Sequence, residues 1–452
     1  MKRVGPAVFA SAVSRVVTIV TQLALVPLLT NAWGVERYGI WAMLTAVPFL
    51  LLMSDFSVTT TSWARMTRFV ARGRMQRARI AFATAWATLA TATAFVAALA
   101  ALAVWGFAGD LFEPTTVLPL DELQWATFAL VLFGLVMLLF RQALINYRAK
   151  GEVALAVWAN IVAYVAEYAA LFAVVLADGG ILIAALAMLA MRCLSLAIAL
   201  VAGARRHSDL RPGFAGASLP ELRRMGGPAL YATLLGAGLI LFQQGSVLAL
   251  GVAAGAAAVP AFVAVRTLSR LALQGVGIVS QPLSHAFGDA LALGQWERAG
   301  RLFGTVLALG IVGGSAVAAG LLVLGRWFVD RWTLGALEAP FGLILAMALA
   351  AFLGTLWTPF VEFMLVAHRQ RGPALANLVS APLAIGLIVL LAPTVGSAAA
   401  GWGLVLVDGI AVLAVTRMVA SGWWREPRFR SGVRQGVAEL RRPWRMFDAN
   451  RA

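Results

Sequence analysis

Apolar segments of 20 or more residues recur along the chain, and this feature limits its possible folds more than any other. The sequence is 61% hydrophobic and only 12% charged, whereas about a quarter of the residues in a soluble domain are charged. A helix of about 20 apolar residues can cross a bilayer, because it satisfies its own backbone polar groups there. The sequence therefore predicts an all-α polytopic membrane protein.

Hydropathy divides the chain into about 12 transmembrane helices. The predicted spans are 8–32, 40–61, 80–106, 124–146, 153–177, 181–202, 227–250, 258–282, 302–325, 341–365, 373–392 and 397–419. Basic residues gather in every second connector and in the tail, while the alternate connectors contain only Arg37, Arg326 and Arg331. The positive-inside rule therefore predicts that both termini are cytoplasmic. It also explains the net charge of +16 without a nucleic-acid partner.

An internal repeat joins the two halves of the chain. Gly73–Thr84 is similar to Gly294–Thr305, and identical residues such as Gly73 and Gly294 are 221 residues apart. A repeat of this length predicts two parallel six-helix lobes around a central cavity, as in many transporters. The expected boundaries are an N-terminal lobe at 1–203, a cytoplasmic interlobe linker at 204–226, a C-terminal lobe at 227–420 and a basic cytoplasmic tail at 421–452.

Several arginines lie inside predicted spans, where a charge must face a polar interior or an opposite charge. Arg15 lies among hydroxyl and amide side chains of the first span, and Arg266 and Arg270 are one turn apart in the eighth. We expect them to line the cavity and bind an anionic phosphate group, since guanidinium pairs well with phosphate. The other predicted substrate-binding residues are Arg192, Gln243 and Gln244. The alternative is that the arginines form structural ion pairs within the membrane.

Carboxylates inside the spans are candidates for coupling to H⁺ or Na⁺, because a desolvated carboxyl group can titrate near neutral pH. They are Asp55, Glu167, Glu362 and Asp408. The sequence does not select among them. Asp55 and Glu167 are also ion-pair candidates for the intramembrane arginines, and Asp55 is within reach of Arg15.

Motifs of catalysis and metal binding are missing from the sequence. No Gly-rich loop ends in Lys-Ser or Lys-Thr, so the chain has no ATPase P-loop, and neither His-Glu-x-x-His nor Gly-x-Ser-x-Gly occurs. The single Cys193 has no disulfide partner, and the three histidines form no ligand cluster. We therefore expect a transporter without a cofactor or metal site, not an enzyme.

Three stretches resemble the Wzx-type, polysaccharide-biosynthesis branch of the MOP superfamily. Residues 27–41 contain Trp-Gly-Val-Glu-Arg-Tyr-Gly, which is similar to the family's Leu-Gly-x-Glu-x-Tyr-Gly with Trp33 in place of Leu. Residues 280–298 and 327–335 resemble the segments around helix 9. The resemblance implies a bacterial inner-membrane flippase that moves polyprenyl-pyrophosphate-linked oligosaccharide by alternating access. It also implies contact of Arg15 and Arg266 or Arg270 with the pyrophosphate.

The same resemblance implies partners, namely the glycolipid, membrane lipids and other polysaccharide-assembly proteins. Two other functions stay open. A MATE-type exporter of organic cations should have an acidic cavity, whereas the intramembrane charges here include several arginines. An O-antigen ligase or polymerase should have a long periplasmic loop, and no predicted connector on that side is long enough to hold a catalytic domain.

Overall fold

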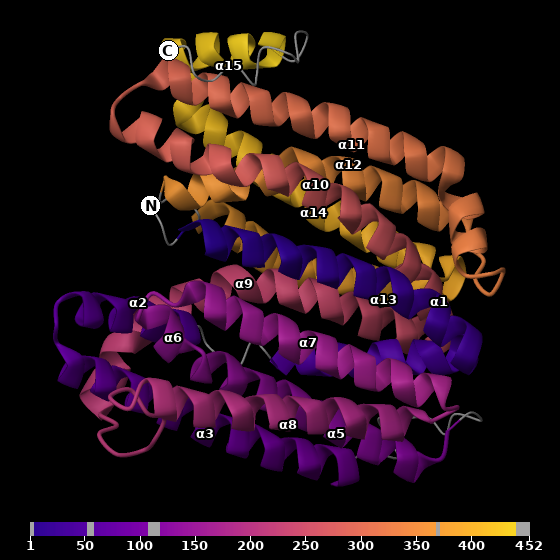
Figure 1. The fold of residues 1–452 in the computed structure, drawn as a ribbon. Helices are drawn as coiled ribbons and strands as arrows, with labels where there is room; N and C mark the ends of the chain where they lie inside the picture. Colours follow the sequence, from indigo (N-terminus) through magenta and orange to yellow (C-terminus); the bar gives the residue numbers. More distant parts are fainter. Residues whose placement is uncertain (1–3, 52–57, 107–117, 368–370, 440–452) are drawn as a thin grey trace. The chain divides into compact units, whose positions relative to one another are not determined.

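A computed structural model describes residues 4–51, 58–106, 118–367 and 371–439. The regular elements of these residues are all helices (Figure 1). Nine of the helices found among them are long and apolar enough to cross a membrane, and Ile240–Ala254 is a shorter apolar helix. The predicted class, an all-α polytopic membrane protein, is confirmed.

The chain forms two compact units, Met1–Ile240 and Leu241–Ala452. The first unit contains α1 (Val4–Leu51), α2 (Val58–Ala71), α3 (Met75–Gly106), α5 (Leu120–Ala143), α6 (Ile145–Ala149), α7 (Val153–Leu176) and α8 (Ile181–Arg206). The second contains α10 (Val259–Ala292), α11 (Trp296–Trp332), α12 (Phe341–Val366), α13 (Arg371–Val395), α14 (Ala398–Ser421) and α15 (Pro427–Glu439). Helix α9 (Leu219–Ala254) begins in one unit and ends in the other. The lobe and linker boundaries expected from the sequence stay predictions.

In the first unit, α5 packs against α8, α1 and α3, and α7 packs against α1 and α8. Local sequence explains where these helices begin and end. Asp121 and Glu122 occupy the first turn of α5, and Arg205 and Arg206 the last turn of α8. Both placements complement the helix dipole. Small and aromatic residues such as Phe140, Ala156 and Ala199 are buried where α5, α7 and α8 meet.

Glycines at matching positions interrupt the helices of both units. Gly73 and Gly294 both have φ of 67°. Around them, the amide of Arg74 donates to the carbonyl of Phe69, and the amide of Gln295 donates to the carbonyl of Ala290. Every residue in one set is 221 positions from its counterpart in the other, so the two connectors have the same local structure. This agreement supports the repeat inferred from the sequence.

A second glycine pair follows the same spacing, although the sequence comparison had not singled it out. Gly34 breaks α1 with φ 78° and ψ 169°, and Gly255 separates α9 from α10 with φ 83° and ψ 157°. Residues with side chains rarely adopt such angles. The break at Gly34 lies between the two predicted spans 8–32 and 40–61.

In the second unit, α14 packs against α12 and α13, and α10 packs against α11 and α12. The first part of the predicted basic tail forms α15, which packs along α11 (Figure 1). Gly300 and Gly304 of α11 face α15, and Gly432 and Gly436 of α15 face α11. An added Cβ at any of the four would clash with the opposing backbone. Residues 440–452 of the predicted tail lie outside the described residues.

Candidate functional site

A buried ion pair joins α7 and α8 in the first unit. Arg192 Nη2 donates to Glu167 Oε2 at 2.6 Å, and Arg192 Nε lies 2.5 Å from Glu167 Oε1. The two side chains are only 5% and 1% exposed. The Arg192 guanidinium also lies over the rings of Phe133 and Phe140, at 5.4 and 5.2 Å. These contacts compensate for placing both charges away from water.

A small cavity adjoins this pair. It has a volume of about 120 Å³ and is lined by residues of α1, α5, α7 and α8, including both Glu167 and Arg192. Tyr164 and Tyr168 also line it, with ring centroids 4.5 Å apart. Among the described residues, Arg192 Nη1 has no hydrogen-bond partner. A buried donor beside such a cavity gives a water molecule or small ion a place to bind.

Asp408 of α14 is the corresponding buried carboxylate in the second unit. Its Oδ1 accepts a hydrogen bond of 2.8 Å from Trp357 Nε1 of α12. Arg270 of α10 is close enough to Asp408 for their opposite charges to interact. Each unit therefore contains an acidic side chain that is buried between helices and lies near an arginine.

The other predicted arginines have different surroundings. Arg266 Nη1 donates to the backbone carbonyl of Gln243 at 2.8 Å, and its guanidinium lies 4.9 Å from the ring centroid of Phe262. These contacts orient the Arg266 side chain, which is partly buried. Gln243 and Gln244 are also partly buried on α9, and Arg15 is partly buried on α1.

The structure brings some predicted residues together and leaves others untested. Arg192 meets Glu167, Arg270 meets Asp408, and Arg266 meets Gln243. Asp55 lies outside the described residues, and the side chain of Glu362 is also not described. Arg15 and Arg266 lie in different units, so a shared cavity that joins them stays a prediction.

Sequence reasoning did not single out Tyr164, Tyr168 or Trp357. The two tyrosines are four residues apart and flank Glu167, so helical spacing already placed all three close together on α7. Trp357 carried no comparable signal. It is one of many tryptophans in an apolar chain, and only the packing of α12 against α14 gives its indole a carboxylate partner.

Comparisons with known proteins were made by sequence and by structure. No protein-family model and no curated protein matches the sequence. A multidrug resistance MATE family transporter of the MOP superfamily, solved in an inward-facing conformation, matches with a TM-score of 0.66 and 13% identity. The match covers 90% of this chain and 99% of that one. The chain has the fold of the MOP superfamily.

Other solved transporters and flippases also have a similar fold. The lipid II flippase MurJ, in an inward closed conformation, matches with a TM-score of 0.64 and 9% identity, over 98% of this chain and 93% of that one. A eukaryotic MATE transporter matches with a TM-score of 0.56 and 13% identity, over 96% and 97% of the two chains. MATE transporters and a lipid II flippase therefore have a fold similar to that of this chain.

Proposed function

We propose that this chain is a flippase that moves a polyprenyl-pyrophosphate-linked oligosaccharide from the cytoplasmic to the periplasmic leaflet. The membrane-spanning helices and the MOP fold support a transporter that works by alternating access. The substrate class follows from the arginines of the spans together with the sequence resemblance to Wzx-type proteins.

One observation carries the proposal: arginines lie on α1 in the first unit and on α10 in the second, within the predicted spans 8–32 and 258–282. A charged side chain at the centre of a membrane helix costs about 2.5–3.5 kcal/mol on insertion scales. A charged residue that costs this much is generally kept only where function needs it. Guanidinium groups bind phosphate through two parallel hydrogen bonds, so Arg15, Arg266 and Arg270 suit a pyrophosphate better than an organic cation.

Lipid analysis tests the proposal directly. A strain that lacks the gene should accumulate the polyprenyl-pyrophosphate oligosaccharide, measured by mass spectrometry of lipid extracts. The wild-type gene should clear it, whereas Arg15→Ala and Arg270→Ala should not, at equal membrane levels. Arg141→Ala is the matched control, because Arg141 is exposed at the end of α5. Normal clearance by both cavity variants would contradict the assignment.

A second function is favoured by a separate observation. Glu167 and Asp408 are buried carboxylates, and a MATE-type exporter of organic cations needs acidic groups within the membrane. In that case the deletion strain should show an unchanged lipid profile and increased sensitivity to cationic drugs. Substitution of Glu167 or Asp408 by the amide should then abolish drug resistance.

A further inference from the structure

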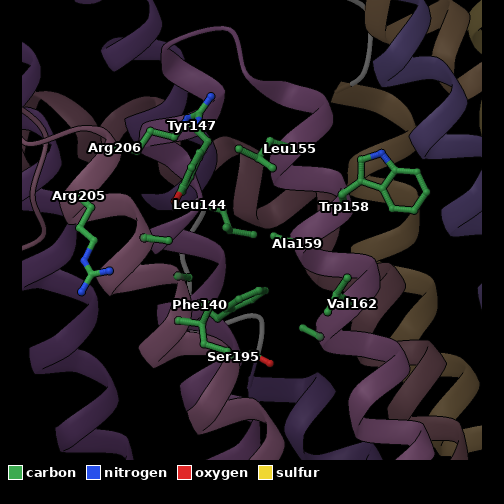
Figure 2. A pocket seen from close by; sticks show the side chains of 14 residues that line it. Phe140, Leu144, Tyr147, Leu155, Trp158, Ala159, Val162, Ser195, Arg205 and Arg206 are labelled. Carbon is green, nitrogen blue, oxygen red and sulfur yellow. The ribbon is translucent and has the colours of Figure 1, made fainter.

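A large apolar groove lies in the first unit, and neither Glu167 nor Arg192 lines it. Its volume is about 660 Å³, and its lining residues come from α5, α6, α7, α8 and the connector between α5 and α6. Figure 2 shows Trp158 and Val162 on one side of the groove and Arg205 and Arg206 on the other. None of the arginines proposed to bind the substrate (Arg15, Arg266 and Arg270) lines this groove.

Exposed apolar side chains form its walls. Val162 is 64% exposed, Ile198 59% and Leu155 42%, so the groove opens to the surroundings of the helices. Phe140 and Leu144 are almost fully buried and form its floor. Because α7 and α8 are both long and apolar enough to cross a membrane, we expect these walls to contact lipid chains and not water. An acyl chain is therefore the natural occupant of the apolar part.

Two arginines at the end of α8 differ in how they are bound. Arg206 donates from Nε and Nη2 to the Glu152 carboxylate at 2.9 and 3.1 Å. His207 Nε2 lies 3.2 Å from the same carboxylate. Arg205 is exposed and lines the groove, and it has no hydrogen-bond or ion-pair partner within the described residues. The charge of Arg206 is thus largely neutralised, while that of Arg205 is available to a ligand.

We propose that this groove binds one acidic glycerophospholipid, with an acyl chain between α7 and α8 and its phosphate at Arg205. Basic pockets between transmembrane helices on the cytoplasmic side bind acidic headgroups, and the positive-inside rule places Arg205 on that side. The single uncommitted guanidinium matches the single negative charge of phosphatidylglycerol.

The transported glycolipid fits this groove less well. Alternating access places a substrate site at the interface between the two repeats, whereas every residue that lines the groove belongs to the first unit. A pyrophosphate also carries more charge than one guanidinium neutralises. The lipid site is therefore independent of the proposed flippase function, and either can fail without the other.

Native mass spectrometry of the full chain tests the site. The detergent-purified protein is incubated with equal concentrations of phosphatidylglycerol and phosphatidylethanolamine, and the lipid-bound fraction is measured. Wild type should retain phosphatidylglycerol selectively. Arg205→Gln should lower its retention about fivefold, as expected for one arginine at a membrane surface. Ala202→Trp should fill the groove and lower the retention of both lipids.

Matched controls separate the groove from general surface effects. Arg223→Gln removes another exposed arginine of the first unit, and Ala197→Trp adds the same bulk to an exposed site on α8 that does not line the groove. Both should bind lipid as wild type does. Equal retention by Arg205→Gln and wild type, or no preference for phosphatidylglycerol, would overturn the proposal. Displacement of phosphatidylglycerol by an equal concentration of undecaprenyl pyrophosphate would also overturn it, and would assign the groove to the transported lipid.

Discussion

Glu167 and Arg192 form an ion pair between α7 and α8 in which both side chains are at least 95% buried. Twenty-five residues separate them in the chain. The pair lies beside the cavity of about 120 Å³, and its guanidinium lies over the rings of Phe133 and Phe140. It therefore has two possible roles, one in stability and one in ion coupling, which substitutions can distinguish.

Removal of one partner should destabilise the protein strongly. Glu167→Leu or Arg192→Met alone leaves an uncompensated buried charge and should cost about 3–5 kcal/mol, whereas the double variant should be close to wild type in stability. The thermal unfolding midpoint of the purified protein measures this. Single variants as stable as wild type would contradict the buried pairing. If the double variant folds but does not transport, the ion pair is needed for function as well as for stability.

The contact between α11 and α15 should depend on its glycines. Gly432→Leu places a side chain against the backbone of Glu297 and should detach α15 from α11. Gln435 Nε2 donates to Glu297 Oε1 at 2.6 Å. Cysteines placed at these two positions, in a Cys193→Ala background, should therefore cross-link efficiently. Replacing Gly432 by Leu should prevent this cross-link. Gly320→Leu is the control, because a Cβ at Gly320 of α11 meets no neighbour. Undiminished cross-linking in Gly432→Leu would show that the close approach of the two helices is not required.

Equal strain is expected at the two repeated connectors. Gly73→Ala and Gly294→Ala should each cost about 1–2 kcal/mol, because a side chain at φ of 67° is strained even where space is open. Asn tolerates this conformation and should cost less at both sites. Unfolding midpoints of the four variants provide the measurement. A cost at only one of the two positions would mean that the connectors are not equivalent.

Acid should weaken the cluster at the end of α8. The hydrogen bond from Arg206 holds the pKa of Glu152 below its ordinary value of 4.5, despite some opposing desolvation. Because the folded pKa is depressed, the stabilisation is complete above pH 4.5 and is lost as the pH falls through the lowered pKa. The exposed location limits it to about 1 kcal/mol or less.

Glu152→Gln isolates this contribution from other carboxylates. At pH 7 the variant should unfold at a lower temperature than wild type, and the difference should shrink as the pH is lowered below 4.5. Glu152→Gln also removes the carboxylate that binds Arg206. Retention of phosphatidylglycerol by this variant is therefore a second measurement. A difference in unfolding temperature that does not change with pH would contradict this assignment.

Much of the fold was predictable because hydropathy and glycine placement are local properties. An apolar run of 20 residues has few stable states in a bilayer other than a helix, so each predicted span overlaps an observed helix. The repeat was visible because connectors such as Gly73 and Gly294 require the same residue for the same backbone angle.

The partners of the intramembrane charges were less predictable. The sequence shows that Arg192 and Asp408 lie inside predicted spans and must find polar contacts. On that ground Arg192 was a candidate for substrate binding and Asp408 a candidate for ion coupling. Their partners depend on the rotation of each helix about its axis and on which helices pack together. Glu167 for Arg192 and Trp357 for Asp408 are set by contacts of α7 with α8 and of α12 with α14.

The sequence by itself thus determined the spans, their helical state and the internal repeat, since each follows from the match between a short segment and its solvent. Only the tertiary structure decided which charges pair, that α15 packs on α11, and that an apolar groove ends at Arg205. These features join residues from separate helices. Many helix packings satisfy the same hydropathy pattern, and side-chain shape and close backbone contacts select one of them.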